Sequence, residues 1–289
     1  MNVISTPPGC PVSVGVLGGG RMGAGIAHAF LIRGANVLVV ERDEEAAHAA
    51  RERVENAVIR SIERGDTDDF NLEVLASRLT VGVDFEGFAD RHLVVEAVPE
   101  EWDLKVSSLR GIEERLAVDA YLASNTSSLS ITELAKELKR PGNFVGLHFF
   151  NPVPASSLIE IVLGEQTAPE LAEAAKGWVE SLGKAAVVVN DAPGFASSRL
   201  GVCIALEAMR MLEEGVASAE DIDTAMVLGY KHPVGPLKTT DIVGLDVRLA
   251  IAEYLHSTLG ARFAPPQILK DKVSAGQLGR KTGKGFFDW

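Results

Sequence analysis

One stretch near the start of the chain restricts the possible folds more than any other. Residues 12–17 alternate apolar and small side chains, three glycines follow, and apolar residues then recur at helical spacing as far as Arg33. The pattern Gly18-x-Gly20-x-x-Gly23 thus stands between a strand and a helix, where a backbone can approach a pyrophosphate and helix amides face its charge. The alternative is a glycine turn that serves packing alone. The residues predicted to bind a dinucleotide are Gly18, Gly19, Gly20, Arg21, Met22 and Gly23.

The residue that ends the second strand predicts which dinucleotide is bound. Gly34 follows the first helix at the position of a left-handed cap, and residues 36–40 form an apolar run that ends at Glu41. A carboxylate there accepts hydrogen bonds from the adenine ribose hydroxyls and repels a 2'-phosphate, so we predict NAD rather than NADP. The neighbouring Arg42 is able to accommodate such a phosphate, but we interpret it as a solvated surface charge.

The order of the remaining elements predicts the fold class. A polar helix is expected over residues 43–64, and further helical stretches separate the strand-like runs. These runs cover residues 79–83, 92–98, 120–124, 144–150, 159–163 and 186–190. Alternating strands and helices indicate a doubly wound, mostly parallel sheet.

After about residue 190 the strand signals end and helical patterns continue over residues 200–214, 218–228 and 245–259. We therefore predict an α/β protein with an N-terminal Rossmann-type domain over residues 1–190. A smaller, all-α C-terminal domain over residues 191–289 follows it.

Composition excludes several classes of function. The net charge of −12 disfavours nucleic acid as a partner, because phosphate backbones bind to basic surfaces. No apolar run approaches a membrane span, and the first residues lack an export signal, so a cytoplasmic protein is expected. Only Cys10, in a start expected to be flexible, and Cys203 are present, which argues against disulfides and a metal cluster.

Three segments carry a resemblance to a known family. They are ASNTSSLSIT at 123–132, GLHFFNPVP at 146–154 and GRKTGKGFFDW at 279–289, and with the glycine pattern and VVEAVPE at 94–100 the similarity spans nearly the whole chain. The sequence resembles the 3-hydroxyacyl-CoA dehydrogenase family. The resemblance implies NAD-dependent oxidation of a (S)-3-hydroxyacyl-CoA to the 3-oxoacyl-CoA, as in fatty acid β-oxidation. It also implies a homodimer formed by the C-terminal helices.

The same resemblance implies a catalytic pair, His148 as general base and Glu160 twelve residues on. Removing a hydroxyl proton as hydride leaves requires a base that titrates near neutrality, and a carboxylate behind the imidazole fixes its tautomer. Taken in isolation, the histidine is better interpreted as one satisfied by a backbone carbonyl.

Further residues are assigned by their match to the family. Ser127 would bind the substrate oxygen near the nicotinamide, and Asn151 would face the nicotinamide ribose. Glu100, Lys105 and Lys281 match positions that contact NAD, although exposed Glu and Lys on a helix are most often solvated. Thr126 and Ser128 are alternatively caps of the helix that starts near Ile131.

The sequence departs from the family at the positions expected to hold the substrate. Ser198 replaces the usual Asn near the catalytic pair, Ser157 replaces a Lys, and Ala57 stands where a coenzyme A contact is usual. Arg60 and Arg64 are the candidates for the coenzyme A phosphates, and an ordinary charged helix face explains them equally well.

Two alternative functions therefore stay open. The first is a related dehydrogenase acting on a carrier-protein thioester or a free hydroxy acid, and the retained HFFNPVP segment favours the coenzyme A thioester over it. The second is an inactive relative that only binds NAD. The presence of Ser127, His148, Asn151 and Glu160 argues against it.

Overall fold

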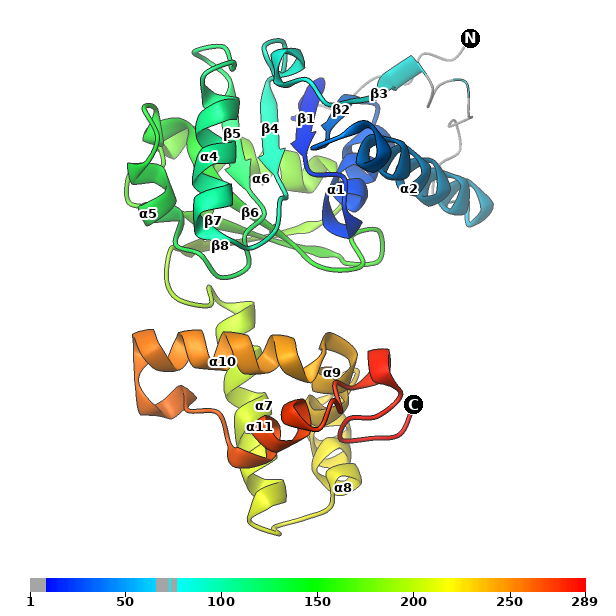
Figure 1. Cartoon of the computed structure of the whole chain (residues 1–289), viewed down its shortest axis with the longest axis vertical. Helices are drawn as coiled ribbons and strands as arrows, with labels where there is room; N and C mark the ends of the chain where they lie inside the picture. Colours follow the sequence, from blue (N-terminus) through cyan, green and yellow to red (C-terminus); the bar gives the residue numbers. More distant parts are fainter. Residues whose placement is uncertain (1–8, 66–72, 74–76) are drawn as a thin grey trace. The chain divides into compact units, whose positions relative to one another are not determined.

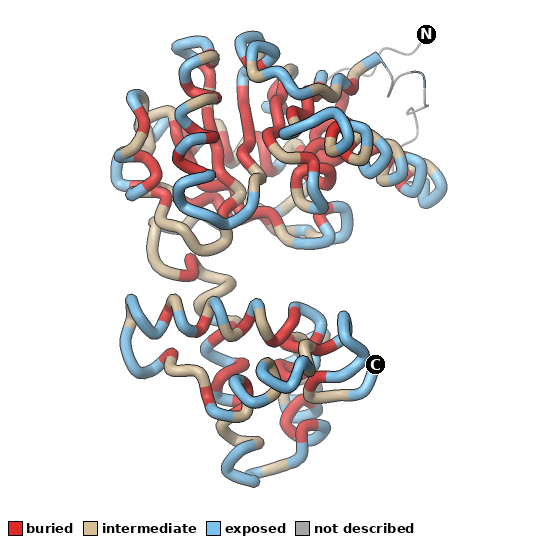
Figure 2. Tube along the Cα trace, in the orientation of Figure 1, coloured by how far each residue is buried: buried red, intermediate tan, exposed pale blue. Residues whose placement is uncertain are grey.

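The computed structural model describes residues 9–65, 73 and 77–289, and the chain divides into two compact units. The first unit, Met1–Asp191, contains all the named strands, and the second, Ala192–Trp289, is built from helices and turns (Figure 1). Each unit has its own buried core, as the burial colouring shows (Figure 2). Among the described residues, no helix combines the length and apolar character needed to cross a bilayer.

The first unit is organised around one eight-stranded sheet in the order β3-β2-β1-β4-β5-β6-β7-β8. The strands are β1 (Ser13–Leu17), β2 (Asn36–Val40), β3 (Leu79–Gly82), β4 (Leu93–Glu96), β5 (Tyr121–Ser124), β6 (Phe144–Phe149), β7 (Leu158–Leu163) and β8 (Ala185–Asn190). Neighbours pair in parallel except β6 and β7, which are antiparallel. The order of the first six strands is that of a dinucleotide-binding fold, so the predicted Rossmann-type sheet is confirmed.

Helices cover the sheet because most of its strands are apolar on both faces, as β2 (NVLVV) illustrates. The helices of the first unit are α1 (Arg21–Leu31), α2 (Glu44–Glu63), α4 (Trp102–Glu113), α5 (Ile131–Lys136) and α6 (Pro169–Ser181). α1, α2 and α6 share one core with the strands, in which Phe30 meets Phe149 edge-on at 6.5 Å between ring centroids. Asp43 caps α2 by accepting a hydrogen bond from the Ala46 amide at 2.7 Å.

The second unit packs its helices around a separate apolar core. They are α7 (Ser197–Glu213), α8 (Ala219–Thr224) with a following π turn (Ala225–Gly229), α9 (Pro236–Val243), α10 (Leu245–Leu259) and α11 (Gln267–Ser274). Val202, Met209 and Leu255 are fully buried in this core. The C-terminal segment is attached through Asp241, whose buried carboxylate accepts hydrogen bonds from the amides of Phe286 and Phe287 and from the Trp289 indole.

The predicted elements lie within a few residues of the observed ones, and Gly34 adopts the expected left-handed conformation with φ +86°. The prediction that Cys10 lies in a flexible start was wrong, because its side chain is buried in the core of the first unit. This burial raises the pKa of its thiol. Sequence patterns also missed α9 and α11, because helices of eight residues give too few turns for a clear apolar period.

Replacing Asp241 with Ala should destabilise the second unit. Three donors, the Phe286 and Phe287 amides and the Trp289 indole, would lose a charged acceptor, so we expect a loss of at least about 3 kcal/mol in the free energy of unfolding. Urea unfolding followed by tryptophan fluorescence measures this loss. The exposed Asp288→Asn serves as control, and equal stability of the two variants would contradict the anchoring role of Asp241.

Candidate active site

The glycine-rich turn between β1 and α1 has the shape that a dinucleotide requires. Gly18 has φ +90°, and a Cβ there would come within 2.9 Å of the Ala97 carbonyl oxygen. A Cβ on Gly23 would meet the Gly18 carbonyl oxygen at 1.7 Å, so α1 starts directly against the turn. At Gly20, by contrast, a Cβ would meet nothing within 4 Å. The first turn of α1 therefore faces a space that a pyrophosphate is able to approach closely.

Glu41 stands at the end of β2 and contacts this turn directly. Its Oε1 accepts a hydrogen bond from the Gly19 amide at 2.7 Å, and its Oε2 accepts one from the Arg42 amide at 3.1 Å. The Arg42 side chain is exposed and donates to Asp43 at 3.0 Å. Arg53 of α2 donates to the Gly19 carbonyl at 3.2 Å, a contact that the sequence analysis missed. The carboxylate of Glu41 is thus the anionic group beside the glycine-rich turn.

His148 and Glu160 are cross-strand partners in the antiparallel pair of β6 and β7. The His148 Nδ1 lies 2.7 Å from the Glu160 Oε2, and the two residues are only 7% and 1% exposed. The register of the two strands explains the twelve-residue spacing seen in the sequence. Phe150 packs against the imidazole, with ring centroids 4.5 Å apart. A carboxylate on Nδ1 fixes the orientation of the imidazole and stabilises its protonated form.

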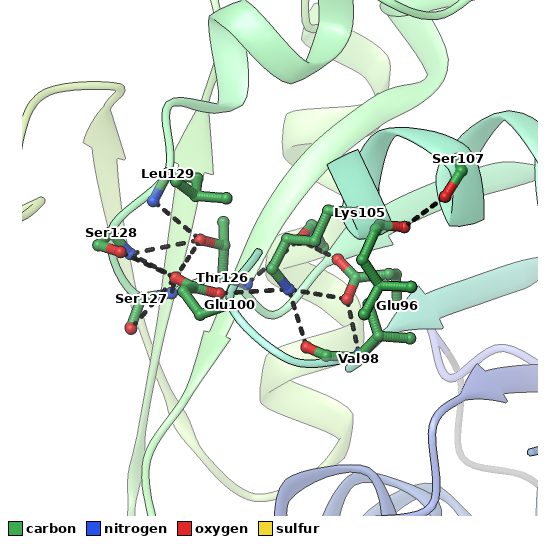
Figure 3. Close-up of polar contacts among 11 residues, drawn as sticks. Glu96, Val98, Glu100, Lys105, Ser107, Thr126, Ser127, Ser128 and Leu129 are labelled. Atoms are coloured by element: carbon green, nitrogen blue, oxygen red, sulfur yellow. Dashed lines mark hydrogen bonds and ion pairs between the residues drawn. The ribbon is translucent and has the colours of Figure 1, made fainter. Parts of the chain in front are cut away.

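The loop after β5, residues 126–129, is named here the serine loop. Glu100 holds it through one carboxylate oxygen, as Figure 3 shows. Its Oε1 accepts hydrogen bonds from the Thr126 hydroxyl (2.6 Å), the Ser127 amide (2.9 Å) and both the amide and hydroxyl of Ser128 (3.0 and 2.9 Å). The Ser127 hydroxyl lies 3.4 Å from the same oxygen. Glu100 therefore fixes the backbone on which Ser127 stands.

The interpretation of Thr126 and Ser128 as caps of α5 was wrong. Ser130 is the cap, since its hydroxyl accepts a hydrogen bond from the Glu133 amide at 3.1 Å. The Thr126 hydroxyl instead accepts from the Ser128 and Leu129 amides within the serine loop.

A buried ion pair lies directly behind Glu100 (Figure 3). Lys105, in the first turn of α4, donates from Nζ to Glu96 Oε1 at 2.8 Å and to the Val98 carbonyl at 3.2 Å, and it lies 3.2 Å from Glu100 Oε2. Glu96 also accepts from the Ser124 hydroxyl at 2.6 Å.

The alternative interpretation of Lys105 as a solvated lysine was wrong, because its side chain is buried. Glu96 and Ser124 were not predicted, although a carboxylate ending an apolar strand was a visible signal. Burial alone would raise the pKa of Glu100, but Lys105 and the serine-loop hydrogen bonds outweigh it and hold that pKa below its usual value.

A basic pocket of about 790 Å³ lies between α1, α2 and residues 151–155. Asn151 lines it, and none of the described lining residues is acidic. The arginines that line it are Arg21, Arg53, Arg60 and Arg64. Arg53, Arg60 and Arg64 follow a spacing of seven and four residues, which places them on one face of α2. Arg60 and Arg64 were predicted from the sequence, and the same spacing was a signal for Arg53.

Two predicted residues belong to the second unit. Lys281 forms an ion pair with Asp246 in the first turn of α10, with Nζ–oxygen distances of 2.6 and 2.7 Å. Ser198 lies in the first turn of α7. Their expected contacts with cofactor and substrate stay predictions. Ser157, the other departure from the family, lines a second pocket of about 330 Å³ together with Lys184 and Arg33.

Comparison with known proteins assigns the family. The family described as 3-hydroxyacyl-CoA dehydrogenase, NAD binding domain, matches residues 13–192, and its C-terminal domain matches residues 194–289. The chain is 40% identical over 276 residues to a probable 3-hydroxybutyryl-CoA dehydrogenase of Deinococcus radiodurans, covering 95% of this chain and 99% of that protein. It is 37% identical over 284 residues to the mitochondrial hydroxyacyl-coenzyme A dehydrogenase of Rattus norvegicus, covering 96% and 90%.

The fold agrees with this similarity. The crystal structure of (S)-3-hydroxybutyryl-CoA dehydrogenase from Ralstonia eutropha matches with a TM-score of 0.91 at 36% identity, covering 96% of this chain and 99% of that one. Both domains are matched in order, and the glycine-rich turn lies inside the matched NAD-binding domain. The chain therefore belongs to the 3-hydroxyacyl-CoA dehydrogenase family, with NAD as its cofactor.

Proposed function

We propose that this enzyme oxidises a (S)-3-hydroxyacyl-CoA to the 3-oxoacyl-CoA, with His148 as general base. The observation that carries the proposal is the buried contact of 2.7 Å between His148 and Glu160 in β6 and β7. β6 belongs to the sheet whose first loop is the glycine-rich turn, so the base and the cofactor turn stand on one scaffold. The names of the relatives support the same thioester class.

The residues of the first unit fit NAD. The open side of Gly20 and the first turn of α1 suit the pyrophosphate, and the Glu41 carboxylate suits the adenine ribose. When bound, NAD supplies the acceptor for the hydride that leaves the substrate carbon. Glu100 and Lys281 are kept as proposed contacts of the cofactor.

The chain's own residues manage the proton. His148 Nε2 takes the proton of the substrate hydroxyl, which prevents charge from building up on the oxygen as the hydride leaves. Glu160 holds Nδ1, keeps the imidazole in one orientation and stabilises the imidazolium that forms. The Ser127 hydroxyl hydrogen-bonds the substrate oxygen, and Asn151 lies toward the nicotinamide ribose. Ser198 positions the acyl part of the substrate.

The basic pocket provides the reason for preferring coenzyme A over a free hydroxy acid. Coenzyme A carries a diphosphate and a 3'-phosphate, and arginine forks bind phosphate through paired, charge-assisted hydrogen bonds. A cluster of four arginines in a protein of net charge −12 is a local site for such an anion. We assign Arg60 and Arg64 to these phosphates, with Arg53 and Arg21 beside them.

We further propose a cytoplasmic homodimer that takes part in fatty acid β-oxidation. The second unit exposes large apolar side chains, with Leu228 66% and Tyr230 76% accessible, which supports a role of its helices in association.

Replacing His148 with Asn should lower kcat by about 10²- to 10⁴-fold, because the hydroxyl proton loses its acceptor. Glu160→Gln should also lower kcat, since the imidazolium loses the carboxylate that stabilises it. Steady-state NADH absorbance and fluorescence titration of NADH measure turnover and cofactor affinity, and the affinity should stay close to wild type. The exposed His48→Asn is the matched control. Near-wild-type turnover of the His148 variant would exclude it as the base.

The enzyme should prefer NAD to NADP, because a 2'-phosphate would meet the Glu41 carboxylate. Glu41→Ala should narrow the ratio of kcat/KM between the two cofactors by about tenfold or more, the effect of one unfavourable charge contact of about 1.4 kcal/mol. Asp43→Asn, next to the site but facing Arg42, is the control. Equal use of both cofactors by the wild type would show that Glu41 does not select.

Arg60→Met and Arg64→Met should each raise KM for 3-hydroxybutyryl-CoA by about tenfold, the value of one charge-assisted bond. The corresponding N-acetylcysteamine thioester, which has no phosphates, should be used equally well by variants and wild type. Arg51→Met, on the same helix but outside the pocket, is the control. The same loss on both thioesters would argue against phosphate binding, and a better rate with a carrier-protein thioester would favour that alternative substrate.

A further inference from the structure

Lys105 is buried almost completely, which is rare for a lysine and requires partners. An ammonium has three N–H donors. Three acceptors surround it here, Glu96 Oε1 at 2.8 Å, the Val98 carbonyl at 3.2 Å and Glu100 Oε2 at 3.2 Å. Two of these contacts are hydrogen bonds and the third is an ion pair, so the ammonium is held on three sides by the protein itself.

The contacts continue from Lys105 through Glu100 to the serine loop (Figure 3). Glu96, on the buried side, is held by the Ser124 hydroxyl at 2.6 Å and the Val98 amide at 2.7 Å. Glu100, on the other side, binds Lys105 through Oε2 and the serine loop through Oε1. One lysine thus connects a rigid strand end to the loop that carries Ser127.

We propose that Lys105 is a positioning residue, which holds Glu100 and through it the serine loop. This inference rests on the proposed function, because Ser127 is assigned to the substrate oxygen there.

The positioning depends on the charge of Glu100. As a carboxylate, Glu100 accepts hydrogen bonds at Oε1 from the amides of Ser127 and Ser128 and from the hydroxyls of Thr126 and Ser128. A protonated carboxyl would carry a hydrogen-bond donor of its own and would accept these bonds less well. Among the described residues, Glu100 forms an ion pair only with Lys105, and Lys105 forms ion pairs only with Glu100 and Glu96. Lys105 favours the ionised form of Glu100, so removing it raises the pKa of Glu100. The serine loop is then released as the pH falls.

The test compares three variants with the wild type. Lys105→Met removes the cation, and the double variant Lys105→Met with Glu96→Gln also removes the buried carboxylate that would otherwise be left unpaired. The double variant therefore guards against a simple failure to fold. Lys176→Met, an exposed lysine paired with Glu173 on α6, is the matched control.

For each variant we would measure kcat against pH with NAD and 3-hydroxybutyryl-CoA, and the Kd of NADH by nicotinamide fluorescence. A general base gives kcat an acid limb of its own, so the protonation of Glu100 should appear as a second, steeper fall on the acid side of it. We expect this second limb to move up by roughly one pH unit or more in Lys105→Met, the effect of losing an opposite charge at this distance. The Kd of NADH should stay near wild type. A Kd raised about tenfold at every pH, with the second limb unmoved, would overturn the proposal in favour of direct cofactor contact. An unmoved second limb with unchanged Kd would overturn it as well.

Hydrogen exchange of the Ser127 and Ser128 amides gives a readout that needs no thioester. These amides should exchange faster in the double variant than in Lys176→Met at the same pH. If the wild type oxidised no 3-hydroxyacyl-CoA, the proposed function would fail, while hydrogen exchange and the Kd of NADH would still test Lys105. Unchanged exchange would refute the positioning role with the proposed function intact.

Discussion

The parallel pairing of β1, β4, β5 and β6 brings the carboxyl ends of these strands to one edge of the sheet, and the proposed site depends on that edge. Each strand ends in a different functional part, the glycine-rich turn, Glu96, the serine loop and the segment with His148. These parts are far apart in the sequence, but the sheet places the ends of neighbouring strands only about 5 Å apart. The site is therefore formed by the sheet as a whole, and no single sequence motif is sufficient to form it.

The reversal of direction at β7 adds what a purely parallel sheet cannot provide. An antiparallel neighbour brings Glu160 directly opposite His148, and the side chains of such a pair lie on the same face. A slip of one residue would turn the carboxylate to the other face and leave the imidazole without it. The burial of β7 itself favours this register, since Ile159 and Ile161 are fully buried on either side of Glu160.

Charge is distributed in the first unit by two different rules. Glu96 and Lys105 form a buried ion pair, in which removing one partner would leave an uncompensated charge at high cost, and the partly exposed Glu100 contacts the same lysine. At the surface pocket, four arginines gather and none of the described lining residues is acidic, which suits an incoming anion. The first arrangement orients a loop, and the second suits the phosphates of the proposed substrate. The same residue types thus differ in role according to burial.

Local patterns in the sequence determined the elements, the glycine-rich turn and the place of Glu41 at the end of β2, because strand and helix periods and glycine conformations are set by neighbouring residues. The family resemblance added His148 and Glu160. Tertiary structure alone decided that Lys105 is buried, that Ser130 caps α5, and which arginines meet at the pocket. Side chains brought together from separate segments depend on which strands pair and in which direction. That choice arises from packing across the whole sheet, and no short window of sequence contains it.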